Sequence, residues 1–320
     1  MNVLLDDSYA FCKSLAKRTA RNFFYSFLGL PADQFRAMCV LYAFMRVSDD
    51  LIDDENVPFW QRDQLLTQWR VSLLQALNSG GVTEPGVFLT HESSTEQCDL
   101  AATELRRSGE LIFPALCDVV RQYTIPHEYL FAVIDGVRMD LQPAGFETFQ
   151  ELSKYCYHVA GAVGLCCIHV WGFHDDRAIG IAIDCGLAFQ LTNILRDLAV
   201  DVGVGRVYLP RADLRQFDVT MQSIANRTLD DRFVNLMQFE VERTKSYYRK
   251  AEKLFEYLEP SGKPILRAML RIYGGLLAEI ERRNYDVFSS EVMLPTWRKL
   301  LITADAVVQR FWFGRPVQVR

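Results

Sequence analysis

Apolar residues recur at spacings of three and four along most of the chain, which is the period of a helix with a buried face. In residues 37–51 and 179–200 the apolar positions cover almost every side of the predicted helix, so both segments are predicted to be long and largely buried. Few segments alternate apolar and polar residues as a half-buried strand would. The pattern therefore predicts an all-α protein.

Proline residues and polar clusters bound the predicted helices. The helices are predicted at residues 5–20, 33–54, 58–78, 99–107, 109–123, 127–138, 148–171, 177–200, 211–215, 221–225, 229–258, 263–287 and 296–310. Residues 78–97 are rich in Gly, Ser and Thr and are predicted to form one long loop, and residues 315–320 a loose tail. Because no repeat or low-complexity segment interrupts the pattern, a single domain over residues 1–320 is predicted.

Charge and cysteine content narrow the classes of function. The 35 basic and 40 acidic residues give a net charge of −5, which argues against nucleic acid as a partner. Eight cysteines without a CxxC pair indicate neither a zinc ribbon nor a disulfide scaffold and favour the reducing cytoplasm. The N-terminal residues do not resemble a secretory signal, and the longest apolar run, 159–173, is shorter than the roughly 20 residues that span a bilayer. Any membrane contact is therefore expected to be peripheral.

The first unusual motif places five acids in the seven positions 49–55, at the end of an apolar helix. Arg46, Asp49, Asp50 and Asp53 fall within an arc of about 100° on that helix, and Tyr42 lies on the same stripe. Like charges one turn apart weaken a helix unless a cation lies between them. The motif is interpreted as a cation site, and the alternative is a solvated acidic helix end.

The second motif carries four oxygen-bearing side chains, Gln190, Asn193, Asp197 and Asp201, on one side of an otherwise apolar helix. Their helical angles span about 80°. Burying such a stripe without partners would cost several kcal/mol. Two such helices in one chain favour a metal-lined cavity, and the alternative is a hydrogen-bonded structural network.

All of these candidate ligands are hard oxygen donors, which favours Mg²⁺, or Mn²⁺ in its place, over zinc. Mg²⁺ usually binds one or two carboxylates together with substrate phosphates, so a diphosphate is the predicted bridging ligand. Arg46, Arg196 and Arg206 are predicted to complete the phosphate site. Arg196 lies off the polar stripe, and its alternative partner is a structural acid. No GxGxxG follows a strand and no HExxH occurs, so neither a nicotinamide fold nor a zinc protease is predicted.

Four segments resemble the squalene/phytoene synthase family: ARNFFYSFLGLP at 20–31, YAFMRVSDDLIDD at 42–54, YCYHVAGAVG at 155–164 and GLAFQLTNILRDLAVDVGVGRVYLP at 186–210. The resemblance extends from about residue 10 to about residue 290. Within the family, ARNFFYSF and DLQPAGFETF are most similar to bacterial presqualene diphosphate synthases of hopanoid pathways. The resemblance implies an isoprenoid synthase fold, a single helical domain around a central cavity.

The activity that the resemblance implies is a Mg²⁺-dependent head-to-head condensation of two farnesyl diphosphates to presqualene diphosphate. Three alternatives remain open: reduction onward to squalene with NADPH, condensation of two geranylgeranyl diphosphates to phytoene, and a non-catalytic binding or assembly factor. Terpene cyclases and chain-elongating prenyltransferases also carry aspartate-rich helices, but the residue order of their second motif differs. The implied partners are prenyl diphosphates, downstream isoprenoid enzymes and a membrane surface.

The resemblance also implies roles for residues. The expected metal ligands are Asp49, Asp53, Asn193, Asp197 and Asp201. The expected catalytic residues are Asp49, Asp50, Asp53, Tyr155, Asp197 and Asp201, with Tyr155 or the released diphosphate accepting the proton. The expected substrate-binding residues are Tyr42, Arg46, Asp140, Gln190, Asn193, Arg196, Arg206, Tyr248 and Arg271. The chain has Thr19-Ala20 where some relatives have His-Ser, so one diphosphate contact of those relatives is not expected.

Overall fold

The computed structural model describes residues 3–20, 24, 27–53, 57–80, 96–141 and 145–313. Within these ranges the backbone is helical apart from turns and one isolated antiparallel bridge between Phe173 and Leu258. This confirms the all-α prediction. The chain divides into two compact units, Met1–Gln142 and Pro143–Arg320. The prediction of a single domain stays a prediction, and most of the predicted loop at 78–97 and the tail at 315–320 lie outside the described residues.

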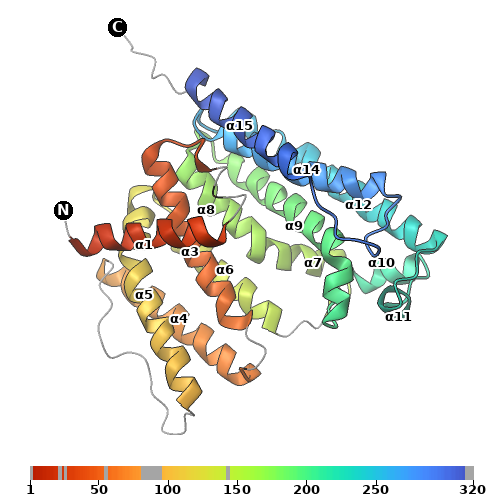
Figure 1. Cartoon of the computed structure of the whole chain (residues 1–320), viewed down its shortest axis with the longest axis horizontal. Helices are drawn as coiled ribbons and strands as arrows, with labels where there is room; N and C mark the ends of the chain where they lie inside the picture. Colours follow the sequence, from red (N-terminus) through yellow and green to blue (C-terminus); the bar gives the residue numbers. More distant parts are fainter. Residues whose placement is uncertain are drawn as a thin grey trace. The chain divides into compact units, whose positions relative to one another are not determined.

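The first unit carries five described helices (Figure 1): α1 (Val3–Thr19), α3 (Ala32–Asp53), α4 (Phe59–Ser79), α5 (Glu96–Gln122) and α6 (His127–Leu141). Its core is built on Trp69, which stacks on Phe44 with ring centroids 6.1 Å apart and contacts Phe113 at 4.5 Å. The indole N–H of Trp69 donates to Ser48 Oγ (2.9 Å), and Ser48 donates to the Phe44 carbonyl (2.8 Å). Because Ser48 faces this core, the opposite side of α3 carries the acidic stripe outward.

Helix α5 is continuous, although the sequence pattern predicts a break between residues 107 and 109. It contains Pro114, which lacks an N–H and should disturb the turn before it. Ser8 of α1 repairs that turn: its Oγ accepts from Ala115 N (3.0 Å) and donates to the Leu111 carbonyl (2.7 Å). A hydroxyl distant in sequence therefore bridges the two backbone groups that the proline separates.

Replacing Ser8 by Ala should lower the free energy of unfolding by about 1–3 kcal/mol, because a buried N–H and a buried carbonyl lose their shared partner. Urea unfolding followed by circular dichroism measures this loss. A loss below about 0.5 kcal/mol would show that α5 satisfies these groups without Ser8.

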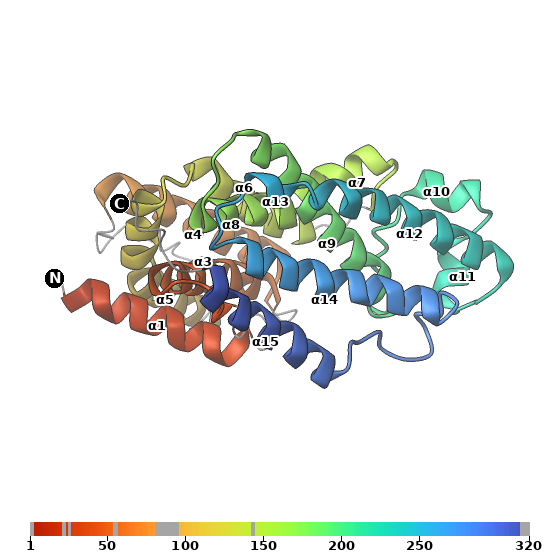
Figure 2. The ribbon, with the colours of Figure 1, turned by 90° about the horizontal axis from the view of Figure 1, so that it is seen from above.

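The second unit contains ten helical segments in the described residues. They are α7 (Phe149–Cys156), η1 (Tyr157–Gly161), α8 (Ala162–Trp171), α9 (Arg177–Gly203), α10 (Arg211–Gln216), α11 (Met221–Ala225), α12 (Asp231–Ala251), α13 (Leu254–Tyr257), α14 (Lys263–Arg282) and α15 (Thr296–Phe313). Helix α9 packs against η1, α8, α12 and α14, so it is the central helix of this unit (Figure 2). Among the described helices α9 alone is long and apolar enough to cross a membrane, but over half of its most apolar stretch is buried in the protein.

The larger departures from the sequence prediction in this unit occur at three places. The predicted helix at 148–171 contains a π-helical turn, η1, and the one at 229–258 is interrupted after Ala251. The helix predicted to reach residue 287 ends at Arg282, because Asn284 and Tyr285 adopt positive φ angles of 52° and 65°.

The contact between α9 and η1 depends on Gly186. A Cβ atom at this position would lie 2.7 Å from the Ala160 carbonyl oxygen and 2.8 Å from the Gly161 Cα. Real Cβ atoms essentially never come that close, so only glycine lets the two backbones touch here.

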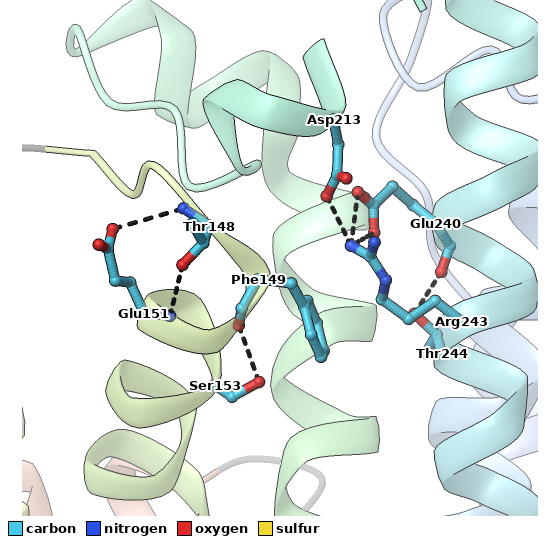
Figure 3. A network of polar contacts seen from close by, with 8 residues as sticks. All are labelled: Thr148, Phe149, Glu151, Ser153, Asp213, Glu240, Arg243 and Thr244. Atoms are coloured by element: carbon cyan, nitrogen blue, oxygen red, sulfur yellow. Dashed lines mark hydrogen bonds and ion pairs between the residues drawn. The ribbon is translucent and has the colours of Figure 1, made fainter. Parts of the chain in front are cut away.

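A buried ion network joins α10 to α12 (Figure 3). The Arg243 guanidinium donates to Asp213 (2.7 Å) and to both oxygens of Glu240 (2.9 and 3.0 Å). Its planar group also lies over the rings of Phe149 and Phe239, at 4.2 and 4.5 Å from their centroids. Glu240 is 2% exposed and Asp213 7%, so one cation serves two buried carboxyl groups.

Candidate active site

The α3 motif forms the predicted mixed-charge cluster. The Arg46 guanidinium pairs with Asp50 and lies 3.7 Å from Asp53, and all three side chains reach solvent. Asp140 on α6 acts electrostatically on Asp49, while Tyr42 acts on Arg46. Within the first unit, the structure therefore brings together six residues that the sequence predicts to be functional: Tyr42, Arg46, Asp49, Asp50, Asp53 and Asp140.

The surroundings of Asp49 disfavour its charged form. Its side chain reaches solvent, yet the protein around it reduces its hydration, and this effect contributes most to raising its pKa to about 7. The negative charges of Asp53, Asp140 and Asp50 raise the pKa further, and Arg46 opposes them. A cluster with this excess of negative charge is suited to binding a cation.

The end of α3 is held by Arg62 of α4. No basic residue occupies the last turn of α3, and the Ile52 carbonyl there accepts from Arg62 Nη1 at 2.8 Å. A cation near the C-terminus of a helix satisfies its last carbonyls and interacts favourably with its dipole. Arg62 thereby fixes the turn that carries Asp53.

The α9 motif contains a buried acceptor without a partner. Asn193 Nδ2 lies 3.4 Å from Gln190 Oε1, to which it donates, but Asn193 Oδ1 is buried and has no hydrogen-bond partner among the described residues. A buried orphan carbonyl oxygen is costly unless a donor or a cation reaches it.

Asp197 and Asp201 continue the stripe. Arg196 holds Asp197 by two hydrogen bonds, from Nε to Oδ1 (2.7 Å) and from Nη2 to Oδ2 (2.5 Å). The sequence left open that Arg196 pairs with a structural acid; in the structure its partner is Asp197, an acid of the motif itself. The Asp201 carbonyl accepts from Arg206 N (2.8 Å), so the chain after α9 folds back onto its end and brings Arg206 to the motif.

Tyr273 on α14 contacts the α9 motif, and the sequence did not predict this role. Its hydroxyl is hydrogen-bonded to the amide of Asn193, and its ring stacks on Phe189 with centroids 4.5 Å apart. Burial raises its pKa to about 12, against the opposing effects of Arg196 and Asn193. One indication was available. Arg271 is exposed, and a residue two positions further along a helix lies on nearly the opposite side, so Tyr273 is expected to face inward.

Two residues expected to bind diphosphate have other partners. The Tyr248 hydroxyl is hydrogen-bonded to Thr192 Oγ1 at 2.8 Å, so Tyr273 is the tyrosine whose hydroxyl meets Asn193. Arg271 is exposed and pairs with Asp305 of α15 at 2.6 Å. In this structure the Arg271 guanidinium is therefore paired at the surface, and its contact with substrate stays a prediction.

Tyr155 is buried and belongs to an aromatic cluster whose other rings are partly buried. Its ring is 5.3 Å from that of Tyr208, at an interplanar angle of 22°, and 5.3 Å from that of Phe146. Helix α7, which carries Tyr155, begins in a capping box in which Thr148 and Glu151 hydrogen-bond each other's backbone (Figure 3). The cap fixes the start of α7 and hence the position of the ring.

The donor set fits Mg²⁺. In the described residues no three His, Cys, Asp or Glu side chains converge as a preformed metal site. Mg²⁺ does not need one, because it keeps several waters and binds one or two carboxylates together with substrate phosphates. The exposed carboxylates of α3 and the orphan Asn193 oxygen are the ligand types that it prefers. The predicted ligands are Asp49, Asp53, Asn193, Asp197 and Asp201.

Comparisons with known proteins agree with these motifs. The sequence profile of squalene/phytoene synthases matches residues 16–298. The chain is 32% identical to a 15-cis-phytoene synthase of Synechococcus elongatus over 92% of this chain and 91% of the relative. It is 30% identical to a phytoene synthase of Arthrospira platensis over the same shares of the two chains.

Two solved structures have the same fold. A dehydrosqualene synthase in complex with ligand superposes with a TM-score of 0.77 at 25% identity, covering 94% of this chain and 96% of that chain. The squalene synthase HpnC from Alicyclobacillus acidocaldarius gives a TM-score of 0.75 at 24% identity, covering 89% and 97%. The two aspartate motifs, the helical architecture and the match over most of the chain lead to one assignment: this is a member of the squalene/phytoene synthase family, prenyltransferases with the isoprenoid synthase fold that join two prenyl diphosphates head to head.

Proposed function

We propose that the chain condenses two farnesyl diphosphates head to head to give presqualene diphosphate. The observation that carries the proposal is the buried Asn193 oxygen without a partner, which lies on the same helical stripe as the carboxylates of Asp197 and Asp201. A stripe of this kind is suited to a cation and its bound diphosphate. In a dry structural core, its oxygen without a partner would only destabilise the fold.

The side chains of both motifs would hold the diphosphate end of the substrate. Mg²⁺, when bound, would supply Lewis-acid stabilisation of the leaving diphosphate. Arg46 already pairs with Asp50 and can donate to phosphate oxygens instead, since guanidinium binds both groups in the same geometry. The amide of Asn193 is held in place by Gln190 and Tyr273, so its oxygen is oriented before the substrate arrives.

Aromatic rings would surround the carbocation that forms when the diphosphate leaves. The rings of Tyr155, Tyr208 and Phe146 form one cluster, in which Tyr155 is buried and the other two rings are partly buried. Each such face can stabilise a cation by about 0.5–2 kcal/mol, most strongly where water is excluded. The double bond of the second prenyl chain then attacks the cation, and loss of one proton closes the cyclopropane. Tyr155 or the released diphosphate accepts that proton.

The support for a C15 substrate is the similarity of ARNFFYSF and DLQPAGFETF to presqualene diphosphate synthases, together with the dehydrosqualene synthase fold match. Dehydrosqualene and squalene are C30 compounds, the size that two C15 units give. The second candidate is phytoene synthesis from two geranylgeranyl diphosphates, which the 32% identity to a phytoene synthase favours.

Incubation of the purified protein with Mg²⁺ and farnesyl diphosphate should yield a cyclopropyl C30 diphosphate, while geranylgeranyl diphosphate remains unused. A cavity sized for C15 rejects a longer chain by overpacking, whereas a C20 cavity accepts a shorter one with looser contacts. Mass spectrometry of the products, with and without NADPH, distinguishes the outcomes. Efficient formation of phytoene would establish the second candidate, and squalene formed only with NADPH would extend the proposal by a reduction. Turnover of neither substrate at saturating Mg²⁺ would support the non-catalytic alternative.

A further inference from the structure

The N-terminus of α10 holds part of the aromatic cluster through its backbone. Arg211 N donates to the Phe146 carbonyl (2.9 Å), and Ala212 N donates to the Glu147 carbonyl (3.0 Å). These are the first two N–H groups of the helix, which have no partner within it. The start of α10 therefore fixes the stretch of chain that carries the Phe146 ring.

A second ring of the cluster depends on the same helix. Tyr208 precedes the first residue of α10 by three positions, and its ring lies 6.3 Å from that of Phe146, at an interplanar angle of 26°. Leu209, in the short connection between Tyr208 and α10, is buried and anchors that connection. Phe146 and Tyr208 are thus both attached to α10, whereas Tyr155 belongs to α7.

An ion pair joins α10 to α12. Helix α10 has only six residues, so contacts with the rest of the protein must hold it in place. The Arg243 guanidinium donates at 2.7 Å to Asp213, which lies in the first turn of α10. The side chains of Asp213 and Arg243 are 11% and 16% exposed, so water competes little for this bond.

The same guanidinium contacts α7. It lies 4.2 Å from the centroid of the Phe149 ring, and Phe149 is the first residue of α7, the helix that carries Tyr155. Figure 3 shows the Arg243 guanidinium between the Phe149 ring and the Asp213 carboxylate. One side chain of α12 therefore contacts both helices on which the aromatic cluster depends.

We propose that Asp213 and Arg243 position the aromatic cluster for the reaction. Both act through other groups: through Phe146 and Tyr208, which α10 holds, and through α7. The proposal rests on the proposed function, since it takes the cluster as the part of the site that surrounds the carbocation. It adds positioning residues that lie outside both aspartate motifs.

A displaced cluster should change the product. The carbocation reacts either with the double bond of the second prenyl chain or with water. Water adds through its oxygen and loses one proton, which gives the free prenyl alcohol. Closely held rings exclude water from the cation, so looser rings should increase the share of alcohol, while the diphosphate end of the substrate is bound as before.

Asp213→Ala tests the link between α10 and α12, because it removes that link and leaves Arg243 paired with Glu240 (2.9 and 3.0 Å). The matched control is Glu240→Gln. Glu240 lies on the same helix as Arg243, so this variant breaks no ion pair between helices. Hydrogen–deuterium exchange without substrate should show the amides of Arg211 and Ala212 exchanging about tenfold faster in D213A, and at the wild-type rate in E240Q.

Product analysis tests the positioning role. It uses whichever prenyl diphosphate the wild type condenses, so an incorrect chain length in the proposed function does not affect it. D213A should lower kcat for condensation about 10–100-fold, as a small misplacement of site groups does, and leave KM within about threefold of wild type. The share of prenyl alcohol should rise about fivefold or more, because water reaches the cation. E240Q should keep the wild-type share, and so should Ser8→Ala, which destabilises the other unit.

Wild-type exchange rates in D213A would overturn the proposal, because other contacts would then hold α10. Faster exchange with a wild-type share of alcohol would also overturn it, as would an equal rise of alcohol in S8A, which would trace the effect to lost stability. If D213A does not fold, Asp213→Asn, which keeps the shape and one acceptor for Arg243, should show the same changes to a smaller extent, and wild-type behaviour of D213N would then overturn the proposal. Turnover of neither diphosphate by the wild type would refute the proposed function, and the exchange measurement would still decide whether Asp213 holds α10.

Discussion

Replacing Asp197 by Asn should reduce turnover by about a thousandfold or more while the protein stays folded. The substitution keeps the shape of the side chain but removes the negative charge that the proposed Mg²⁺–diphosphate complex requires, and electrostatic stabilisation of this kind is usually the largest catalytic contribution. It also replaces one of the two acceptors of Arg196 by an amide N–H₂ group, so the paired hydrogen bonds that hold the side chain in place are lost. Steady-state kinetics over a Mg²⁺ titration, with thermal melting in parallel, measure both effects.

The matched control is Asp184→Asn on the same helix. Asp184 lies off the polar stripe and pairs with Lys250 at 3.7 Å, so its loss should leave turnover within a few-fold of wild type. If D197N kept turnover within tenfold of wild type at saturating Mg²⁺, the assignment of α9 to the metal would be wrong. If D197N unfolded while D184N did not, the stripe would be the hydrogen-bonded structural network that the sequence left open.

Replacing Arg243 by Met should lower the free energy of unfolding by about 3–5 kcal/mol, because it leaves two buried carboxyl groups without their shared cation. Arg249→Met on the same helix is the control. Arg249 pairs with Glu242 at the surface, where such pairs contribute at most about 1 kcal/mol, so this variant should be nearly as stable as wild type. Denaturant unfolding of the two variants gives the difference, and equal losses would show that the network around Glu240 adds nothing specific.

The pH dependence of stability provides a second readout of the network. Burial chiefly, and the Asp213 charge in addition, raise the pKa of Glu240 to about 8, and Arg243 opposes them. Because this value is higher than the ordinary carboxyl pKa of about 4.3, folding takes up a proton. That contribution to stability is complete below the ordinary pKa and is lost as the pH rises toward and through 8. Glu240→Gln should therefore flatten the fall in stability over this range, and parallel profiles for E240Q and wild type would contradict a protonated Glu240.

The helical periodicity predicted the all-α class because most helices bury one face, and burial determines the spacing of apolar residues. It failed in α5, where the pattern predicted a break between residues 107 and 109 and the helix continues. Gly109 packs against the rings of Phe113 and Trp69, and local propensity does not include a contact with a residue of another helix such as Trp69. The end of α14 was not predicted because Asn284 and Tyr285 adopt positive φ angles, and no glycine at these positions indicates such a conformation in the sequence.

The site was predictable where its geometry is a property of one helix. The spacing along α3 predicted the cluster of Arg46 with its acids, and the spacing along α9 predicted the stripe from Gln190 to Asp201. Contacts between helices were not predictable in this way. Tyr248 and Tyr273 both lie on long amphipathic helices, and only packing decides that the hydroxyl of Tyr273 meets Asn193 while that of Tyr248 meets Thr192.

The backbone contact at Gly186 influences the geometry of the candidate site. The residue touches the π-helical turn that directly follows Tyr155 and Cys156, and on α9 it precedes Gln190 by one helical turn. Because Gly186 has no side chain, α9 and η1 lie in backbone contact, and this contact sets the distance between the oxygen stripe and the aromatic cluster. Any larger residue at position 186 must push the two helices apart and increase that distance. A change of residue at position 186 is therefore expected to alter the spacing of the candidate site without replacing any of its chemical groups.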